Sequence, residues 1–186
     1  MIMDAIQKGC RNFLIGIGGS ATNDAGTGML QAMGFRFYDA QDQEIIHCTG
    51  GTMHLIARID DSAVPAYVRE SCFTIACDVD TPFCGKEGAA PVFAPQKGAD
   101  AAMVQQLDAG MASLAQVIQD KYHVDIVPIA GAGAAGGMGG AFRAFLNATL
   151  KPGIDMVLDA INFDRTIQGA DLIITGEGKI DFQTAK

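Results

Sequence analysis

The stretch LIGIGGSATNDAGTG, residues 14–28, decides the fold, because a short apolar run breaks there into five glycines mixed with small polar side chains. Residues 23–34 then read as a helix. A strand that ends in glycines before a helix presents main-chain N–H groups and the positive end of the helix dipole to an anion. Such a segment is also typical of an ordinary tight turn. The stretch therefore predicts a strand–loop–helix unit whose loop is a candidate site for phosphate or carboxylate.

Outside this stretch, strand-like runs alternate with segments of helical period. Strands are predicted at 12–18, 35–37, 72–77 and 171–175, which is the pattern of an α/β fold. The clearest helix covers about 99–121, where apolar residues recur at spacings of three and four: Met103, Leu107, Met111, Leu114 and Ile118. The segment 35–45 alternates around a polar turn and predicts a β-hairpin.

Composition narrows the class of protein. The chain has 186 residues, 49% of them hydrophobic, which is enough for one ordinary domain with a sizeable core. Thirteen basic and 21 acidic residues give a net charge of −8 without a basic cluster, so we expect no nucleic-acid partner. Residues 126–142 are uncharged, but Pro128 and the glycines make them a poor membrane helix.

The N-terminus does not resemble a signal peptide, so we expect a cytoplasmic protein with no membrane partner. The five cysteines form no CxxC pair, and neither a disulfide framework nor a zinc site is predicted.

Three further clusters repeat the pattern of the opening stretch. Residues 76–100 place Asp78 and Asp80 directly after an apolar strand, where carboxylates commonly face a ligand crevice. Residues 131–142 carry six glycines, which suit either ligand approach or close helix packing. Residues 171–181 end a strand in glycines beside charged side chains. We therefore expect several loops to converge on one anionic ligand.

Other anion-binding signatures are weak or missing. Gly16, Gly18 and Ala21 satisfy a loose dinucleotide fingerprint with Asp39 near the expected distance, although Asp39 fits a hairpin turn better than a ribose contact. No Walker A motif is present, because Gly85-Lys86 and Gly178-Lys179 are not followed by Ser or Thr. A dinucleotide-binding oxidoreductase thus stays open as an alternative.

Four blocks together resemble the bacterial glycerate kinases, in order and at similar spacing: GIGGSATNDAGTGMLQAMG (16–34), ACDVDTPFCGKEGAAPVFAPQKGA (76–99), GAGAAGGMGGAF (131–142) and ITGEGKID (174–181). The resemblance implies ATP-dependent, Mg²⁺-requiring phosphorylation of D-glycerate to a phosphoglycerate. It also implies two α/β domains, one Rossmann- or flavodoxin-like and the other inserted into it. We expect the inserted domain within about 35–165, with 1–34 and 166–186 belonging to the Rossmann-like domain.

The resemblance covers roughly the middle half of the family's length. The family's amino-terminal and carboxy-terminal parts have no counterpart in residues 1–186, and Phe182 stands where the family usually has serine. We therefore expect a central fragment that is inactive alone and associates with itself through exposed sheet surface. Besides an active kinase and an oxidoreductase, a non-catalytic remnant of a kinase is a further alternative.

Phosphoryl transfer gives the recognised blocks their expected roles. Asp78 is the first catalytic candidate, either for orienting or deprotonating the glycerate hydroxyl or for reaching the metal, and Asp181 is the second. The expected donors to phosphate or carboxylate are Gly18, Gly19, Ser20, Thr22 and Asn23. Lys86, Glu177 and Lys179 are further candidates for substrate or phosphate contacts. Asp24 fits a helix cap and a ligand equally well, and the metal ligands stay unassigned.

Overall fold

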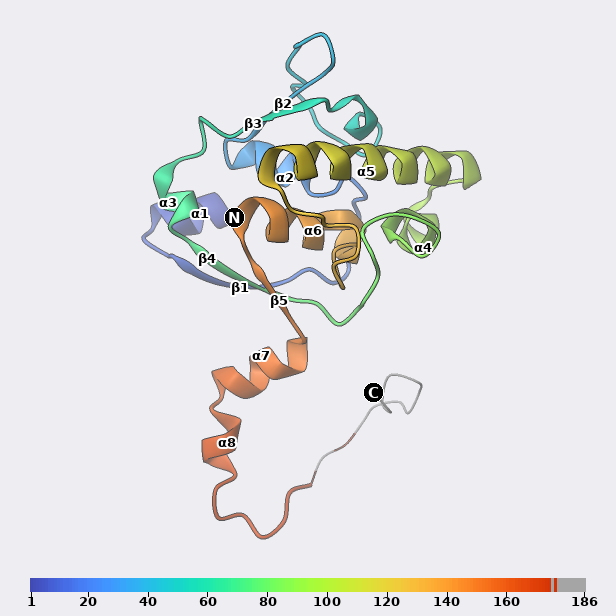
Figure 1. The fold of residues 1–186 in the computed structure, drawn as a ribbon. Coiled ribbons are helices and arrows are strands. Elements are labelled where there is room, and N and C mark those ends of the chain that lie inside the picture. Colours follow the sequence, from blue (N-terminus) through green and yellow to red (C-terminus); the bar gives the residue numbers. More distant parts are fainter. Residues whose placement is uncertain (175, 177–186) are drawn as a thin grey trace. The chain divides into compact units, whose positions relative to one another are not determined.

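The computed structural model describes residues 1–174 and 176, and it divides the chain into two compact units, Met1–Gly153 and Ile154–Lys186. The first unit holds the five strands that the structure describes and the helices that pack on them. In Figure 1 its parallel sheet lies on one side of α6 (Ala134–Leu146), and the long helix α5 (Ala101–Tyr122) lies on the other. The α/β class expected from the sequence is confirmed.

A three-stranded parallel sheet positions the loops that matter for function. Its strands are β1 (Asn12–Gly16), β4 (Cys72–Ala76) and β5 (Thr149–Lys151), in the order β1-β4-β5. Gly16 pairs with Ala76, so β1 and β4 end side by side. The segments that follow these two strands therefore leave the sheet at the same edge. The strands predicted at 12–18 and 72–77 are confirmed as β1 and β4.

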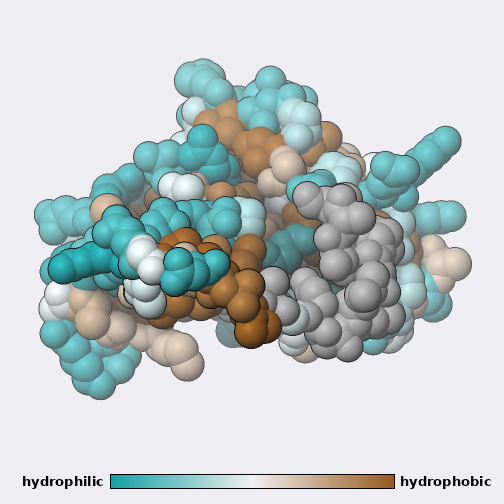
Figure 2. All heavy atoms as spheres, turned by 90° about the horizontal axis from the view of Figure 1, so that it is seen from below, coloured by the Kyte–Doolittle hydropathy of each residue, from teal (hydrophilic) through white to brown (hydrophobic). Residues whose placement is uncertain are grey.

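One face of this sheet is buried and the other is open. Phe13 stacks on Phe73 with ring centroids 5.0 Å apart, and Phe73 contacts Phe142 of α6 at 5.9 Å. The alternate residues point the other way, and Leu14 of β1 is 67% exposed. Figure 2 shows that hydrophobic residues interrupt the otherwise largely hydrophilic surface of the molecule. The apolar sheet surface expected from the sequence is therefore present at Leu14.

Helix α5 follows the predicted apolar spacing. The Asp100 side chain accepts a hydrogen bond from the Met103 amide at 2.8 Å and so caps the helix start. Met111, Leu114 and Ile118 are buried against the core. Met103, predicted to belong to the same stripe, is 52% exposed, because it lies in the first turn, where it lines a surface hollow.

The predicted hairpin over 35–45 is formed in part. An antiparallel bridge joins Tyr38 to Glu44, and the Ile45 amide donates to the Phe37 carbonyl at 2.8 Å. The regular partner of strand β2 (Arg36–Tyr38) is β3 (Arg58–Asp60), with which it pairs in antiparallel fashion. The turn itself is present, because the Asp39 carboxylate accepts the amides of Gln41 and Gln43, both at 2.9 Å. Asp39 is thus used inside its own turn.

Short elements complete the first unit: α1 (Ile2–Gln7), α2 (Thr27–Ala32), η1 (Met53–Leu55), α3 (Ala66–Arg69), α4 (Ala89–Phe93) and η2 (Pro95–Lys97). The second unit contains α8 (Phe163–Thr166) and all of α7 (Gly153–Ala160) except its first residue. The strand predicted at 171–175 is not formed over residues 171–174, whose backbone pairs with no described strand. The apolar side chains of this segment are exposed. Residue 175 lies outside the described residues.

Candidate anion-binding site

A cavity of about 230 Å³ opens where β1 and β4 end. It takes its walls from the segments after the two strands, from α4 and η2, and from the start of α6. The polar and small residues that line it are Gly18, Gly19, Ser20, Ala76, Cys77, Asp78, Gln96, Lys97, Ala134 and Ala135. The predicted convergence of separate loops is therefore found for the first two glycine-containing blocks and the start of the third.

The glycine loop after β1 leaves its main chain accessible. The amides of Gly18 and Gly19 donate to no protein acceptor among residues 1–174 and 176. Gly19 has φ +69°, a left-handed conformation that side chains of L-residues rarely adopt, and an added Cβ would meet open space. The backbone thus favours glycine here, and the turn exposes amides that can bind an oxyanion.

Asp78 lines the same cavity and lies two residues beyond the end of β4. Its Oδ1 accepts a hydrogen bond from the Gly153 amide at 2.7 Å. Its Oδ2 has no hydrogen-bond donor among the residues that the structure describes. The carboxylate is therefore held in place through one oxygen and exposed through the other.

Lys97 is the site residue that sequence reasoning missed. Its Nζ donates to Ser20 Oγ at 2.9 Å and to the Thr22 carbonyl at 2.6 Å. Burial lowers the pKa of Lys97, and the charge of Asp24 partly opposes this shift. The available signal was a lysine inside the second glycine-containing block, but nothing local indicates that residue 97 reaches back to residues 20–22.

The other predicted polar residues of the first loop have distinct positions. Thr22 contacts Lys97 through its carbonyl, whereas Asn23 lines a second hollow of about 390 Å³ on the other side of the loop. Both Asp24 carboxylate oxygens accept main-chain amides, from Gly26 at 3.1 Å and from Gly28 at 3.2 Å. Asp24 therefore orders the segment at the start of α2, as the capping role predicts, and its role as a ligand stays a prediction.

The glycines of 131–140 support this loop by close packing. Ala135, Gly136 and Gly137 have positive φ at the start of α6, and the Gly136 carbonyl accepts the Ala25 amide at 2.9 Å. A Cβ at Gly136 would lie 2.2 Å from the Thr22 carbonyl oxygen. Of the two roles considered for this cluster, close backbone approach is the one seen.

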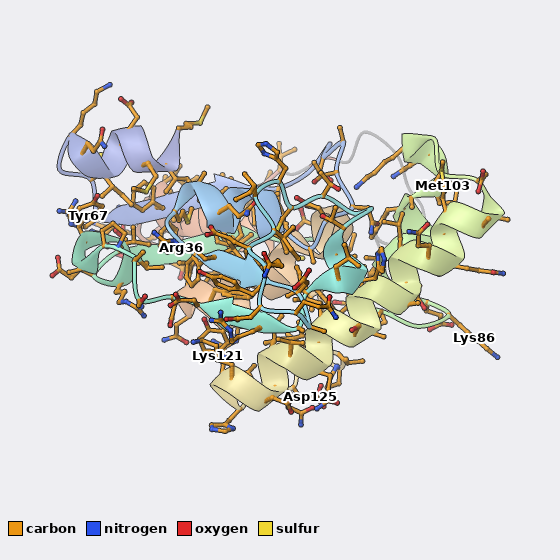
Figure 3. The ribbon with its side chains drawn as sticks, turned by 90° about the horizontal axis from the view of Figure 1, so that it is seen from above. Arg36, Tyr67, Lys86, Met103, Lys121 and Asp125 are labelled. Atoms are coloured by element: carbon orange, nitrogen blue, oxygen red, sulfur yellow. The ribbon has the colours of Figure 1, made fainter. Side chains whose placement is uncertain are left out.

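Several predicted residues lie elsewhere. Lys86 is exposed and does not line the cavity, and Figure 3 shows its side chain extending outward. The loop turns at Gly85, whose amide is held by Asp108 at 2.8 Å, and this directs the following residue to the surface. The predicted positions Glu177, Lys179 and Asp181, together with Phe182, fall outside the described residues.

The described residues contain no metal-binding cluster and no membrane-spanning helix. Over residues 1–174 and 176, no three His, Cys, Asp or Glu side chains gather as a metal-binding group. Within the same residues, no helix combines the length and apolar character needed to cross a bilayer.

All five cysteines are free thiols, and burial raises the pKa of the Cys77 thiol at the cavity wall.

The fold and the position of the candidate site are those of a ligand-binding α/β protein. Glycine amides, a lysine and a carboxylate surround one cavity at the carboxyl edge of a parallel sheet, which is where α/β proteins bind their ligands. The glycerate kinase family matches residues 1–186, and the chain belongs to this family.

Individual relatives agree with this assignment. The chain is 48% identical over 185 residues to a glycerate kinase of Bacillus cereus, covering 100% of this chain and 48% of the relative. It is 46% identical over 184 residues to a glycerate 2-kinase of Escherichia coli K12, covering 99% and 48%. A crystal structure assigned as glycerate kinase 2 from Salmonella typhimurium LT2 matches with a TM-score of 0.89 and 46% identity, over 100% of this chain and 49% of that one. The chain thus spans about half the length of the relatives it matches.

Proposed function

We propose that the protein containing this chain transfers the terminal phosphoryl group of ATP to D-glycerate and forms a phosphoglycerate. Family membership supports the reaction. The observation that carries the proposal for this chain is the joint presence of the Gly18-Gly19-Ser20 loop and the Asp78 carboxylate at one cavity. Both substrates are anions and the chain has a net charge of −8, so main-chain dipoles and cations must compensate their charge.

The residues divide the chemistry between them. Gly18, Gly19 and Ser20 offer N–H and O–H donors to the oxygens of phosphate or carboxylate. Asp78 orients the acceptor hydroxyl of glycerate and takes up its proton through the exposed Oδ2, while the Gly153 amide holds Oδ1.

The family resemblance also implies Mg²⁺, and the donor set fits such an ion. Mg²⁺ is usually held by one or two carboxylates together with phosphate oxygens and water, and Asp78 Oδ2 would hold the ion in the alternative to its contact with the acceptor hydroxyl. When bound, the ion would neutralise charge on the phosphates. Glu177 and Asp181 remain proposed contributors to metal or ribose binding, and Lys86 and Lys179 to phosphate binding. Thr22 and Asn23 stay proposed donors near the loop.

The domain division remains part of the proposal, with an inserted domain within about 35–165 and Rossmann-like flanks at 1–34 and 166–186. We also propose that residues 1–186 are inactive alone. In-line transfer requires both substrates to be held within about an ångström of their productive geometry.

A coupled assay tests the proposed function. The full-length protein, given D-glycerate, ATP and Mg²⁺, should release ADP and a phosphoglycerate in equal amounts. L-Glycerate and glycerol serve as comparison acceptors. Absence of ADP release with D-glycerate, together with a difference spectrum on adding NAD(P), would favour the oxidoreductase instead. Against that alternative, Asp39, the expected ribose contact, already binds the amides of its own turn.

A further inference from the structure

The position of Lys97 is fixed by local structure. It ends the short helix η2, and Gly98 follows in a left-handed conformation with φ +96°. From there the side chain reaches the loop after β1, 77 residues earlier in the chain, at Ser20 Oγ. Lys97 lines both the 230 Å³ cavity that holds Asp78 and the 390 Å³ hollow beside Asn23. It therefore stands where the two spaces meet.

The ammonium group of Lys97 forms no salt bridge within the described part of the chain, although the charge of Asp24 acts on it from a distance. Its two recorded acceptors, Ser20 Oγ and the Thr22 carbonyl, are both neutral, and no described carboxylate forms an ion pair with it. The side chain is partly buried, so water compensates its charge only in part. An ammonium has three protons, and two of them are used here.

Ser20 adds a second donor at the same place. Its Oγ accepts from Lys97, and its own hydroxyl proton is left to donate to a ligand. The amides of Gly18 and Gly19 are near by in the same cavity wall and have no described acceptor. A cation, a hydroxyl and two amides thus line one cavity wall, a donor set that matches an oxyanion.

We propose that Lys97 binds a substrate oxyanion directly, with Ser20 as its partner donor. This inference rests on the proposed function for the identity of the substrate, because the oxyanion is either a phosphate of ATP or the carboxylate of D-glycerate. Asp78 is the other charged residue among those that line the 230 Å³ cavity. The cation fixes the anionic end of the ligand while Asp78 addresses the acceptor hydroxyl.

Titration of the full-length protein separates binding from mere support of the loop. Isothermal calorimetry is run with D-glycerate, a non-hydrolysable ATP analogue and inorganic phosphate, on wild type, Lys97→Met and the control Lys8→Met. Lys8 is exposed, and its partner within the described residues is Asp4 on α1. Loss of a charge-assisted hydrogen bond should lower the affinity for the ligand concerned by at least about tenfold. Lys8→Met should bind all three ligands as wild type does.

The pattern of loss identifies the oxyanion. Weaker binding of the analogue and of phosphate, with glycerate unchanged, assigns Lys97 to the nucleotide; weaker glycerate alone assigns it to the carboxylate. Unchanged binding of all three ligands would overturn the inference. An equal loss of affinity for glycerate and the analogue would also overturn it, because that pattern indicates a collapsed loop. Selective loss of phosphate affinity in a protein that does not phosphorylate glycerate would keep the inference and reject the proposed function.

A labelling experiment covers the case in which Lys97→Met does not fold. Wild-type protein is acetylated with an amine-reactive reagent and the modified lysines are quantified by mass spectrometry. Saturating ATP analogue or D-glycerate should slow modification of Lys97 several-fold and leave Lys8 unaffected. Equal modification of Lys97 with and without either ligand would contradict direct contact.

Discussion

The Asp78 carboxylate is held by the main-chain amide of Gly153, at 2.7 Å, across 75 positions of sequence. Strand β4 delivers Asp78 to the edge of the sheet, and Gly153 follows shortly after β5, the next strand in the sheet. The contact therefore depends on the order of strands and not on any local motif. It leaves one carboxylate oxygen for substrate or metal.

Replacement of Asp78 tests its catalytic role. In the full-length protein, Asp78→Asn should keep the contact to Gly153 through the amide oxygen, so thermal unfolding should be unchanged. It removes the charge and the proton acceptor, and kcat should fall by at least about 100-fold. Asp4→Asn, on the exposed face of α1, is the matched control. Turnover within a fewfold of wild type would remove Asp78 from the catalytic residues.

Gly153 provides a test that leaves the carboxylate itself in place. A Cβ at this position would lie 3.1 Å from Asp78 Oδ2. Gly153→Ala should therefore displace the Asp78 carboxylate by a few tenths of an ångström. We expect kcat to fall about tenfold while the folding free energy changes little. Gly16→Ala, where an added Cβ meets nothing within 4 Å, is the control. Equal kinetics for both variants would mean that the orientation of Asp78 is not critical.

The loop glycines call for different substitutions at adjacent positions. At Gly19 φ is +69°, so any side chain there is strained. Gly19→Ala should therefore lower the free energy of unfolding by about 1 kcal/mol. Gly18→Ala, at ordinary φ and in open space, should fold normally and weaken ATP or glycerate binding by crowding. Urea unfolding and KM measurements on both variants check this, and equal stability losses would contradict it.

A charged cluster far from the loop predicts acid sensitivity. Asp61 contacts Lys121 at 2.9 Å and Arg69 at 3.3 Å. Burial alone would raise the pKa of Asp61, but Lys121 and Arg69 outweigh it and lower that pKa below its ordinary value of 3.8. Because the folded-state pKa is depressed, the stabilisation is complete above the unfolded-state value and is lost as pH falls below about 4.

The measurement compares wild type with Asp61→Asn. At pH 7 the variant should be less stable by about 1 kcal/mol, a value already reduced for solvent screening. The difference should shrink towards zero near pH 3, as followed by urea unfolding across the acid range. A difference that stays constant with pH would assign the effect to packing.

The sequence predicted those parts of the site that strand ends determine. Gly18, Ser20 and Asp78 each follow a strand with a clear apolar pattern, and parallel pairing of β1 with β4 is sufficient to bring them together. Lys97 could not be found this way, because its contact depends on how η2 folds back on the loop. The partner of β2 was missed for a similar reason, since Asp39 favoured a local hairpin while β3 lies 20 residues further on.

The open face of the parallel sheet leads to the last prediction. Leu14 is 67% exposed on β1, which is an edge strand of the sheet, and large exposed apolar side chains promote association. Residues 1–186 expressed alone should therefore form oligomers in light scattering, and Leu14→Lys should shift them towards monomer. Neither form should phosphorylate glycerate, because the proposed site needs both substrates held together. The full-length protein assayed in parallel supplies the reference rate. A monomeric, wild-type segment with turnover on the order of 1 s⁻¹ would show instead that residues 1–186 contain every group the reaction requires.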